Sequence, residues 1–163
     1  MELFGGAATC DIPSDWIDAS TLRDVPDNQE VFVDRSGELS VIVEILEYQS
    51  GVEDSDSAKF FFTDLADADH AVSTEIDEIG ILRHRPFLSD PQGAVVTSIK
   101  GKHVKAKSGP DQEPHTVYVN MTLFRAIHVA ADILVTTHAP RDISVIHNVI
   151  VESLEFSNPE LFS

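Results

Sequence analysis

The first third of the chain contains two segments whose apolar positions predict β-strands. In residues 28–34, NQEVFVD, apolar and polar residues alternate with a period of two, which is typical of a half-buried strand. Residues 39–48, LSVIVEILEY, are β-branched and almost continuously apolar, so we expect a central strand buried on both faces. The turn residues RSG at 35–37 separate the two segments. The pair should therefore form a hairpin.

Two further segments show helical spacing. Residues 57–72 are rich in helix formers and acids, although three successive phenylalanines in the segment also suit a strand. Asp56 or Ser57 is placed to cap this helix. One face of it would carry Phe61, Leu65, Ala68 and Val72. Residues 141–156 predict an amphipathic helix with Asp142 as its N-cap. Its apolar face would carry Ile143, Ile146, Ile150 and Leu154.

The order of elements along the chain predicts a layered fold. The remaining predicted elements are a strand at 7–12, a short helical turn at 15–26, a strand leading into a loop at 73–87, a strand or hairpin at 93–107, and strands at 116–129 and 131–140. The short connections between strands favour an antiparallel sheet, and two helices far apart in the chain can cover both of its faces. We expect a single domain over residues 1–163, with an α/β sandwich architecture.

Charge is distributed unevenly along the chain. The 163 residues have a formal net charge of −17, which disfavours binding to nucleic acid or to anionic membranes. Residues 1–80 hold 20 Asp and Glu against 3 Lys and Arg, whereas residues 81–163 hold 8 of each kind. One interpretation is a solvated acidic surface. The other is a surface that attracts a partner with a basic face, because such a field accelerates encounter.

Cys10 is the only cysteine, so it cannot form an internal disulfide, and we expect a reducing compartment. The first residues do not join a basic segment to an apolar one, which predicts no signal peptide. No apolar run has the length of a transmembrane helix.

The residues that most often carry catalysis do not form a recognisable motif. None of the seven histidines lies at metal-ligand spacing from another, and no glycine-rich phosphate loop or nucleophile elbow occurs. We therefore predict no metal and no cofactor. His128 and His138 lie in apolar runs, where an interior or sheet-face position is the expectation and catalysis the alternative.

Two acids interrupt the most apolar strand. Glu44 and Glu47 cannot both be buried without partners, because burying an unpaired carboxylate is costly. Their spacing of three places them on opposite faces of a regular strand, unless a bulge intervenes. Either Glu47 lies at the strand end and Glu44 pairs with an arginine, or both belong to a functional surface. The one basic cluster is predicted to be a solvated edge or hairpin, with a docking surface as the alternative. It contains Lys100, Lys102, Lys105 and Lys107.

The N-terminal segments resemble the Ran guanine nucleotide release factor family, the Mog proteins of nuclear import. The resembling features are the start LFGGA at 3–7, the residues Ile17, Asp18, Ser20, Leu22 and Arg23, the segment VPDNQEV at 25–31, the two strand acids, and the ending NPELFS. The resemblance is specific over about the first 47 residues and weak between them and the ending.

The resemblance implies a fold, a partner and a site. The implied fold is an α/β/α sandwich with a six-stranded, mostly antiparallel sheet flanked by helices, as in PsbP proteins. The implied partner is the GTPase Ran, in GTP-bound and nucleotide-free forms, with release of nucleotide, chiefly GTP, and a location in the nucleus with cytoplasmic exchange. We expect a monomer that acts by binding rather than as an enzyme. The residues that would bind Ran are Arg23, Pro26, Asp27, Glu30, Glu44 and Glu47.

Two rival interpretations predict other behaviour. One is an enzyme that uses Glu44 and Glu47 as an acid–base pair, which the missing nucleophile, metal and cofactor motifs disfavour. The other is a PsbP-like scaffold without exchange activity, which shares the fold but should lack the segment at 22–31.

Overall fold

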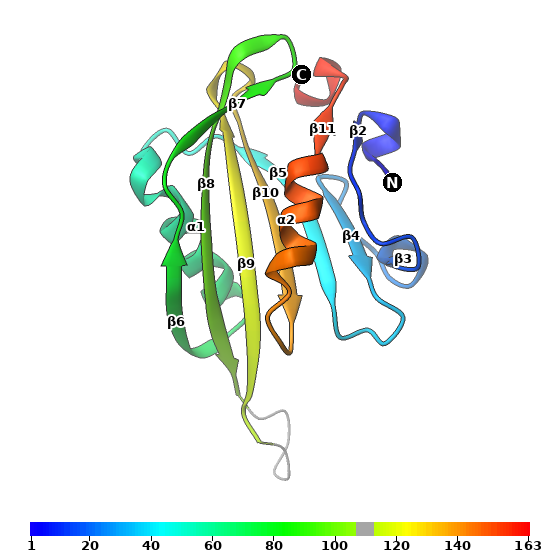
Figure 1. The fold of residues 1–163 in the computed structure, drawn as a ribbon, viewed down its shortest axis with the longest axis vertical. Coiled ribbons are helices and arrows are strands. Elements are labelled where there is room, and N and C mark those ends of the chain that lie inside the picture. Colours follow the sequence, from blue (N-terminus) through cyan, green and yellow to red (C-terminus); the bar gives the residue numbers. More distant parts are fainter. Residues whose placement is uncertain (107–112) are drawn as a thin grey trace.

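A computed structural model of the chain describes residues 1–106 and 113–163. Its main element is one antiparallel sheet (Figure 1). The strands of this sheet are β3 (Ile17–Asp18), β4 (Gln29–Val33), β5 (Ser40–Glu47), β6 (Ala71–Ile79), β7 (Arg83–Phe87), β8 (Asp90–Lys105), β9 (His115–Ala126) and β10 (Ala131–Ala139). Their order is β3-β4-β5-β10-β9-β8-β6, and β7 also pairs with β8. The sheet therefore has eight strands among the described residues, and the expectation of six was wrong.

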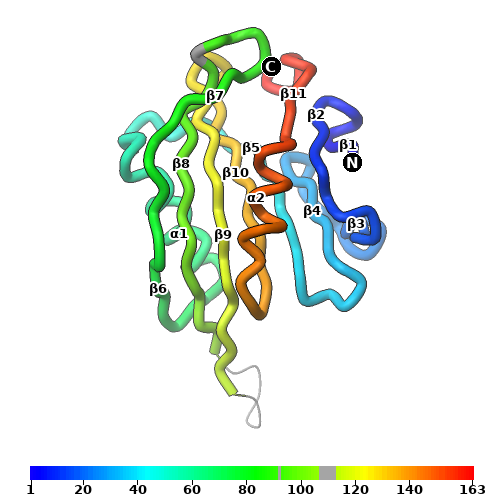
Figure 2. Tube along the Cα trace, in the orientation of Figure 1, coloured from blue at the N-terminus to red at the C-terminus, as the bar shows by residue number. Residues whose placement is uncertain are grey.

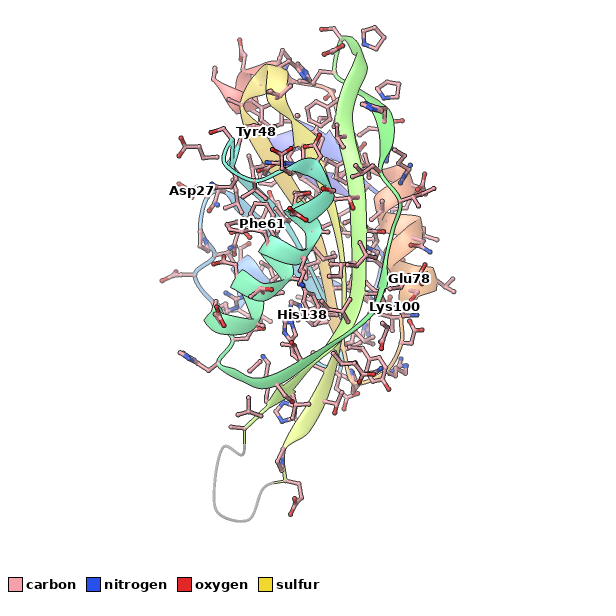
Figure 3. All side chains as sticks on the ribbon, turned by 90° about the vertical axis from the view of Figure 1, so that its left-hand side faces the viewer. Asp27, Tyr48, Phe61, Glu78, Lys100 and His138 are labelled. Carbon is pink, nitrogen blue, oxygen red and sulfur yellow. The ribbon has the colours of Figure 1, made fainter. Side chains whose placement is uncertain are left out.

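Two helices cover opposite faces of the sheet, as Figures 1 and 3 show together. Helix α1 (Asp54–Ala68) contacts β6, β8 and β9, whereas α2 (Ser144–Ser153) contacts β9 and β10. Neighbouring residues of one strand separate into the two cores: Leu123 packs on the α1 side and Phe124 on the α2 side. This alternation is what the strand pleat dictates. The predicted α/β/α sandwich is confirmed.

The chain ends form a second, small sheet beside α2. Its strands are β1 (Glu2–Leu3), β2 (Ala8–Thr9) and β11 (Glu155–Phe156). Figure 2 shows the two ends of the chain close together at this corner. Short 3-10 turns at Phe4–Gly6, Ala19–Thr21, Ile127–Val129 and Pro159–Phe162 complete the chain. Cys10 is buried here, and burial raises the pKa of its thiol to about 11.

The predicted hairpin is confirmed, because β4 and β5 pair antiparallel and Val31 lies opposite Ile42. β5 is central, but it is fully buried on one face only. Val41 and Val43 are completely buried, whereas Ile42 on the other face is half-buried. The long strands at 116–129 and 131–140 are confirmed as β9 and β10.

Helix α1 begins and ends earlier than predicted. It starts at Asp54 after Glu53, with no side-chain cap at its N-terminus, and Val72 belongs to β6 rather than to the helix. The buried face contains Phe61 and Phe62, so the phenylalanine run is helical. Helix α2 is shorter than the segment predicted for it, and its N-cap is Ile143 rather than the predicted Asp142, although the Asp142 carboxylate accepts a hydrogen bond of 2.9 Å from the Ser144 backbone N–H.

The basic cluster lies on an internal strand, not on an edge. β8 is a single strand that pairs with β9 on one side and with β6 and β7 on the other, so the predicted edge position was wrong. Lys100 pairs with Asp142, Lys102 with Asp77 and Lys105 with Asp69. Lys107 lies outside the described residues. The segment predicted as a loop after the strand at 73 forms β7.

No helix among the described residues is long and apolar enough to cross a membrane.

Candidate functional site

The segment 22–28 forms a turn fixed at the C-terminal end of β5. Asp18 caps the 3-10 turn before it by accepting from the Ser20 N–H at 2.8 Å. The Gln29 N–H donates to the Pro26 carbonyl at 2.9 Å, which closes the turn that displays Asp27. Asn28 then exchanges hydrogen bonds with Ile45, one through its backbone carbonyl and one through its side-chain amide. The turn therefore lies beside the last residues of β5.

This part of the surface is acidic and includes an exposed apolar side chain. Asp24, Asp27 and Glu47 are exposed, and none of them forms an ion pair within residues 1–106 and 113–163. Leu22 is 68% exposed in the same turn. Figure 3 shows Asp27 and Tyr48 together at the end of the sheet where α1 begins. Unpaired carboxylates and an exposed leucine in one turn are suited to a partner that offers basic and apolar groups.

The two strand acids lie on opposite faces of β5. Pairing with β10 is continuous from Ser40 to Glu47, so no bulge brings the carboxylates together. Glu44 is half-buried and accepts a hydrogen bond of 2.8 Å from the Gln29 amide. The alternative in which Glu44 pairs with an arginine was wrong, because its partner is Gln29, whereas Glu47 does lie at the strand end. An acid–base pair made of these two residues does not fit this arrangement.

Glu30 has an internal partner. Its carboxylate accepts a hydrogen bond of 2.5 Å from the Phe4 backbone N–H, and Phe4 has a φ of 50°. The next two residues, Gly5 and Gly6, also have positive φ values, of 65° and 90°. Glu30 thus anchors the left-handed turn at LFGG, whose conformation L-residues rarely adopt.

A buried network that the sequence did not indicate holds the chain after Glu47. The Arg125 side chain is almost fully buried and donates to Asp132 at 3.0 Å and to the carbonyls of Val52 and Gln49, each at 2.6 Å. Asp132 in turn accepts from the Gln49 N–H at 2.9 Å. Burial opposes the charge, but the bond to Asp132 and the surrounding carboxylates raise the pKa of Arg125. Only the sequence pairing of a lone arginine and a lone aspartate in adjacent apolar strands could have indicated this network.

The Tyr48 ring is also held by Arg125, whose guanidinium carbon lies 4.6 Å from the ring centroid. This contact has the geometry of a cation–π interaction. Together these bonds fix the direction in which β5 ends, and therefore the position of Glu47.

The predicted site residues divide into two groups. Arg23, Pro26 and Asp27 are exposed on the turn, with Glu47 at the neighbouring strand end. Glu30 and Glu44 are half-buried, and each has a hydrogen-bond partner within the chain. Leu22 and Tyr48 were not among the predicted site residues, although Leu22 is in the segment that carried the resemblance. Within the described residues, no group of three His, Cys, Asp or Glu side chains is arranged to hold a metal ion.

The histidines in apolar runs have different surroundings. His138 is largely buried in β10, as expected, whereas His128 is exposed in the turn Ile127–Val129 and its Nδ1 lies 3.5 Å from Asp90. His128 is therefore not an interior residue.

Comparisons with known proteins relate the chain to one family. Residues 1–140 match the family model described as Ran-interacting Mog1 protein. The chain is similar to a Ran guanine nucleotide release factor from Danio rerio, with 36% identity over 140 residues, covering 85% of this chain and 76% of that protein. It is also similar to the nuclear import protein mog1 of Schizosaccharomyces pombe, with 33% identity over 146 residues, covering 86% and 76% respectively.

The fold has a counterpart among solved structures. The crystal structure of the Saccharomyces cerevisiae Ran-binding protein Mog1p superimposes with a TM-score of 0.78 over 100% of this chain and 97% of that one. Sequence identity in this superposition is 23%, so the likeness concerns the fold.

Proposed function

The chain belongs to the Ran-interacting Mog1 family, and from this we propose that it binds the small GTPase Ran, promotes release of its guanine nucleotide, chiefly GTP, and supports nuclear protein import. Relatives in this family carry the names of a Ran guanine nucleotide release factor and of a nuclear import protein. In this proposal the protein is a single-domain monomer of the nucleus that exchanges with the cytoplasm, and it has no enzymatic step of its own.

The observation that supports a binding role is the acidic turn with its exposed leucine. Asp27 and Glu47 are exposed without ion-pair partners in the described part of the chain, and Leu22 and Pro26 are exposed in the same turn as Asp27. Keeping unpaired like charges together costs free energy unless a partner neutralises them. We assign the primary contacts to Arg23, Pro26, Asp27 and Glu47, and assign to Glu30 and Glu44 the positioning of the turn and strand.

Release requires only differential binding. If the protein binds nucleotide-free Ran more tightly than nucleotide-bound Ran, linkage lowers the nucleotide affinity of Ran by the same factor. The carboxylates can achieve this in two ways. They can offer the phosphate-binding lysine of the GTPase a substitute anion, or they can disturb the bound Mg²⁺.

Purified protein and Ran loaded with labelled GTP provide the test. Binding in the micromolar range or tighter and faster release of label are expected. No binding at tens of micromolar would contradict the proposal, whereas binding without acceleration of release would indicate a scaffold. Repeating the assay with excess chelator separates the two routes: a mechanism through Mg²⁺ loses its effect once the ion is removed from Ran, and a substitute anion does not.

A further inference from the structure

The outer edge of β6 is the long open border of the sheet. β6 is the last strand in the sheet order and has nine residues, of which all but Ala71 are exposed. At the opposite border, β3 has only two residues. Figures 1 and 2 show no element beyond β6. Among residues 1–106 and 113–163, no backbone hydrogen bond joins β6 to any strand other than β8. A row of unpaired N–H and C=O groups is a template for another strand.

The two faces of this edge have different chemistry. Ile76 lies opposite Gly101. A Cβ atom added at Gly101 would contact the ring of Phe62, which belongs to α1. Ile79 lies opposite Ile99, which belongs to the same core cluster as Phe62. These two isoleucines are therefore on the α1 face, and they are 38% and 47% exposed.

The other face of the edge is acidic. Glu75 lies opposite Lys102 and Glu78 opposite Lys100, which bonds to Asp142 beside α2. Figure 3 shows Glu78 and Lys100 on the α2 side of the sheet. Asp77 joins this side by pairing with Lys102 at 2.9 Å. No basic residue occurs in the sequence of β6.

We propose that the β6 edge binds an extended segment of a partner protein in which basic and apolar residues alternate. Such a segment would add a strand by main-chain hydrogen bonds, its apolar side chains covering Ile76 and Ile79 and its basic side chains meeting Glu75 and Glu78. The alternation of strand side chains imposes this pattern on the partner.

A second copy of the chain is a poor occupant. Pairing β6 with β6 of another copy would place the acidic faces side by side, and like charges on directly opposite strand residues are destabilising. The surface lies at the opposite border of the sheet from β4 and the acidic turn, so this inference goes beyond the proposed function and does not depend on it.

The test uses a synthetic peptide of about eight alternating lysines and valines. Saturable binding is expected, with slower hydrogen exchange in residues 71–79.

Two N-methylated forms of the peptide separate strand addition from simple attraction to an acidic protein. In a strand, the N–H groups of alternate residues point to opposite edges, so methylating all lysine nitrogens blocks one edge and methylating all valine nitrogens blocks the other. One of these peptides should bind as the parent does, and the other should bind at least about tenfold more weakly. Equal binding by both, or by neither, would overturn the proposal.

Matched variants locate the site. The double variant Glu75→Gln with Glu78→Gln should bind the parent peptide about fivefold more weakly, since exposed charge pairs contribute modestly to affinity. The double variant Asp27→Asn with Glu47→Gln makes the same change in net charge. It should leave the affinity for the peptide unchanged and lower the affinity for Ran. The reverse pattern, or equal losses from both variants, would contradict an edge site without bearing on the proposed function.

Discussion

Glu30 and Glu47 are acids of the same hairpin, but their surroundings differ. Glu30 already accepts a hydrogen bond of 2.5 Å from the Phe4 N–H, so a partner that took this carboxylate would have to compensate for the loss of that bond. Glu47 is exposed at the end of β5. A charged group without an internal partner gains the most from a basic partner, so Glu47 should contribute more to binding than Glu30.

Replacing Glu47 by lysine tests this assignment. The Glu47→Lys variant should keep its melting temperature within a few degrees, because an exposed strand end tolerates either charge. Its affinity for Ran should fall by about 2 kcal/mol, roughly thirtyfold, because attraction becomes repulsion. Nucleotide release should fall in parallel.

The control is Glu38→Lys, which makes the same charge change at an exposed position at the other end of the hairpin. It should bind Ran almost normally. A Glu47→Lys protein that melts early, or one that binds as well as the Glu38→Lys protein, would remove Glu47 from the site.

At this scale the sequence predicted which residues are exposed acids, but not which of them have partners. The partner of Glu30 is 26 positions away in the chain, and that of Glu44 is an amide on the neighbouring strand. Such pairings depend on strand register and on the path of the N-terminus, which periodicity alone does not specify. The exposure of Leu22 likewise depends on how the turn lies on β5.

Among the elements, the connection between β5 and α1 is held by several hydrogen bonds from one buried side chain. Arg125 reaches from β9 to the carbonyls of Gln49 and Val52 and to the carboxylate of Asp54, at 3.0 Å, in the first turn of α1. The strand that ends in Glu47 and the helix that follows are thus held by one side chain. Breaking a buried pair costs about 3–5 kcal/mol, because the remaining charge is left without compensation.

Arg125→Met should therefore destabilise the protein by a few kcal/mol, which urea unfolding measures. Hydrogen exchange should accelerate first in residues 48–54, the segment whose carbonyls lose their donor. Adding Asp132→Asn to Arg125→Met removes the orphaned carboxylate and should recover part of the loss. If the single variant is as stable as the parent, or the second substitution deepens the loss, the network does not hold this connection.

The types of the long helices and strands were predictable, whereas their boundaries and the short strands β3 and β7 were not. The apolar runs gave β5, β9 and β10 correctly because their length and β-branching exclude other structures. The predicted face of α1 failed at its C-terminal end because His70 adopts a φ of 54°, which ends the helix before Val72. Histidine adopts a positive φ more often than most residues, but positive φ is still uncommon at any residue other than glycine, so one histidine does not predict a helix end. The separation of β6 from β7 depends on the bulges and on pairing with β8, and the sequence pattern indicates neither of these.

For the molecule as a whole, both faces of the sheet contain a buried histidine. On the α1 side the buried His103 packs against Phe62, and in the layer under α2 the buried His147 lies between two threonines. Its Nε2 lies 2.9 Å from Thr122 Oγ1 and its Nδ1 lies 3.1 Å from Thr137 Oγ1. Burial lowers the pKa of His147 to about 4.

A second histidine is held neutral on the other side of the sheet. Burial also lowers the pKa of His138 to about 4; the Asp69 charge opposes this effect, while Lys105 and His103 add to it. Each imidazole therefore binds a proton in the unfolded chain at a higher pH than in the folded protein, because the unfolded pKa is about 6.5. The free energy of unfolding therefore falls as pH decreases through the range in which the unfolded chain binds more protons than the folded protein.

Stability should consequently fall as pH decreases from about 6.5 towards 4. Between pH 7.5 and pH 5 each of the two histidines should remove about 2 kcal/mol at most, since the unfolded state is protonated and the folded state is not. Hydrogen bonds from Lys100 and Ser144 lower the pKa of Asp142 to about 2, so the carboxyl of Asp142 contributes only below this window.

Urea unfolding of the parent and of His147→Gln across the window measures the slope. The variant should be less stable at pH 7.5, because the amide replaces only part of the bonding to Thr122 and Thr137, but its stability should depend less on pH. His84→Gln, which alters an exposed histidine of β7, should keep the parent slope. An unchanged slope in His147→Gln would mean that His147 is protonated in the folded protein, and that the layer under α2 accommodates a charge.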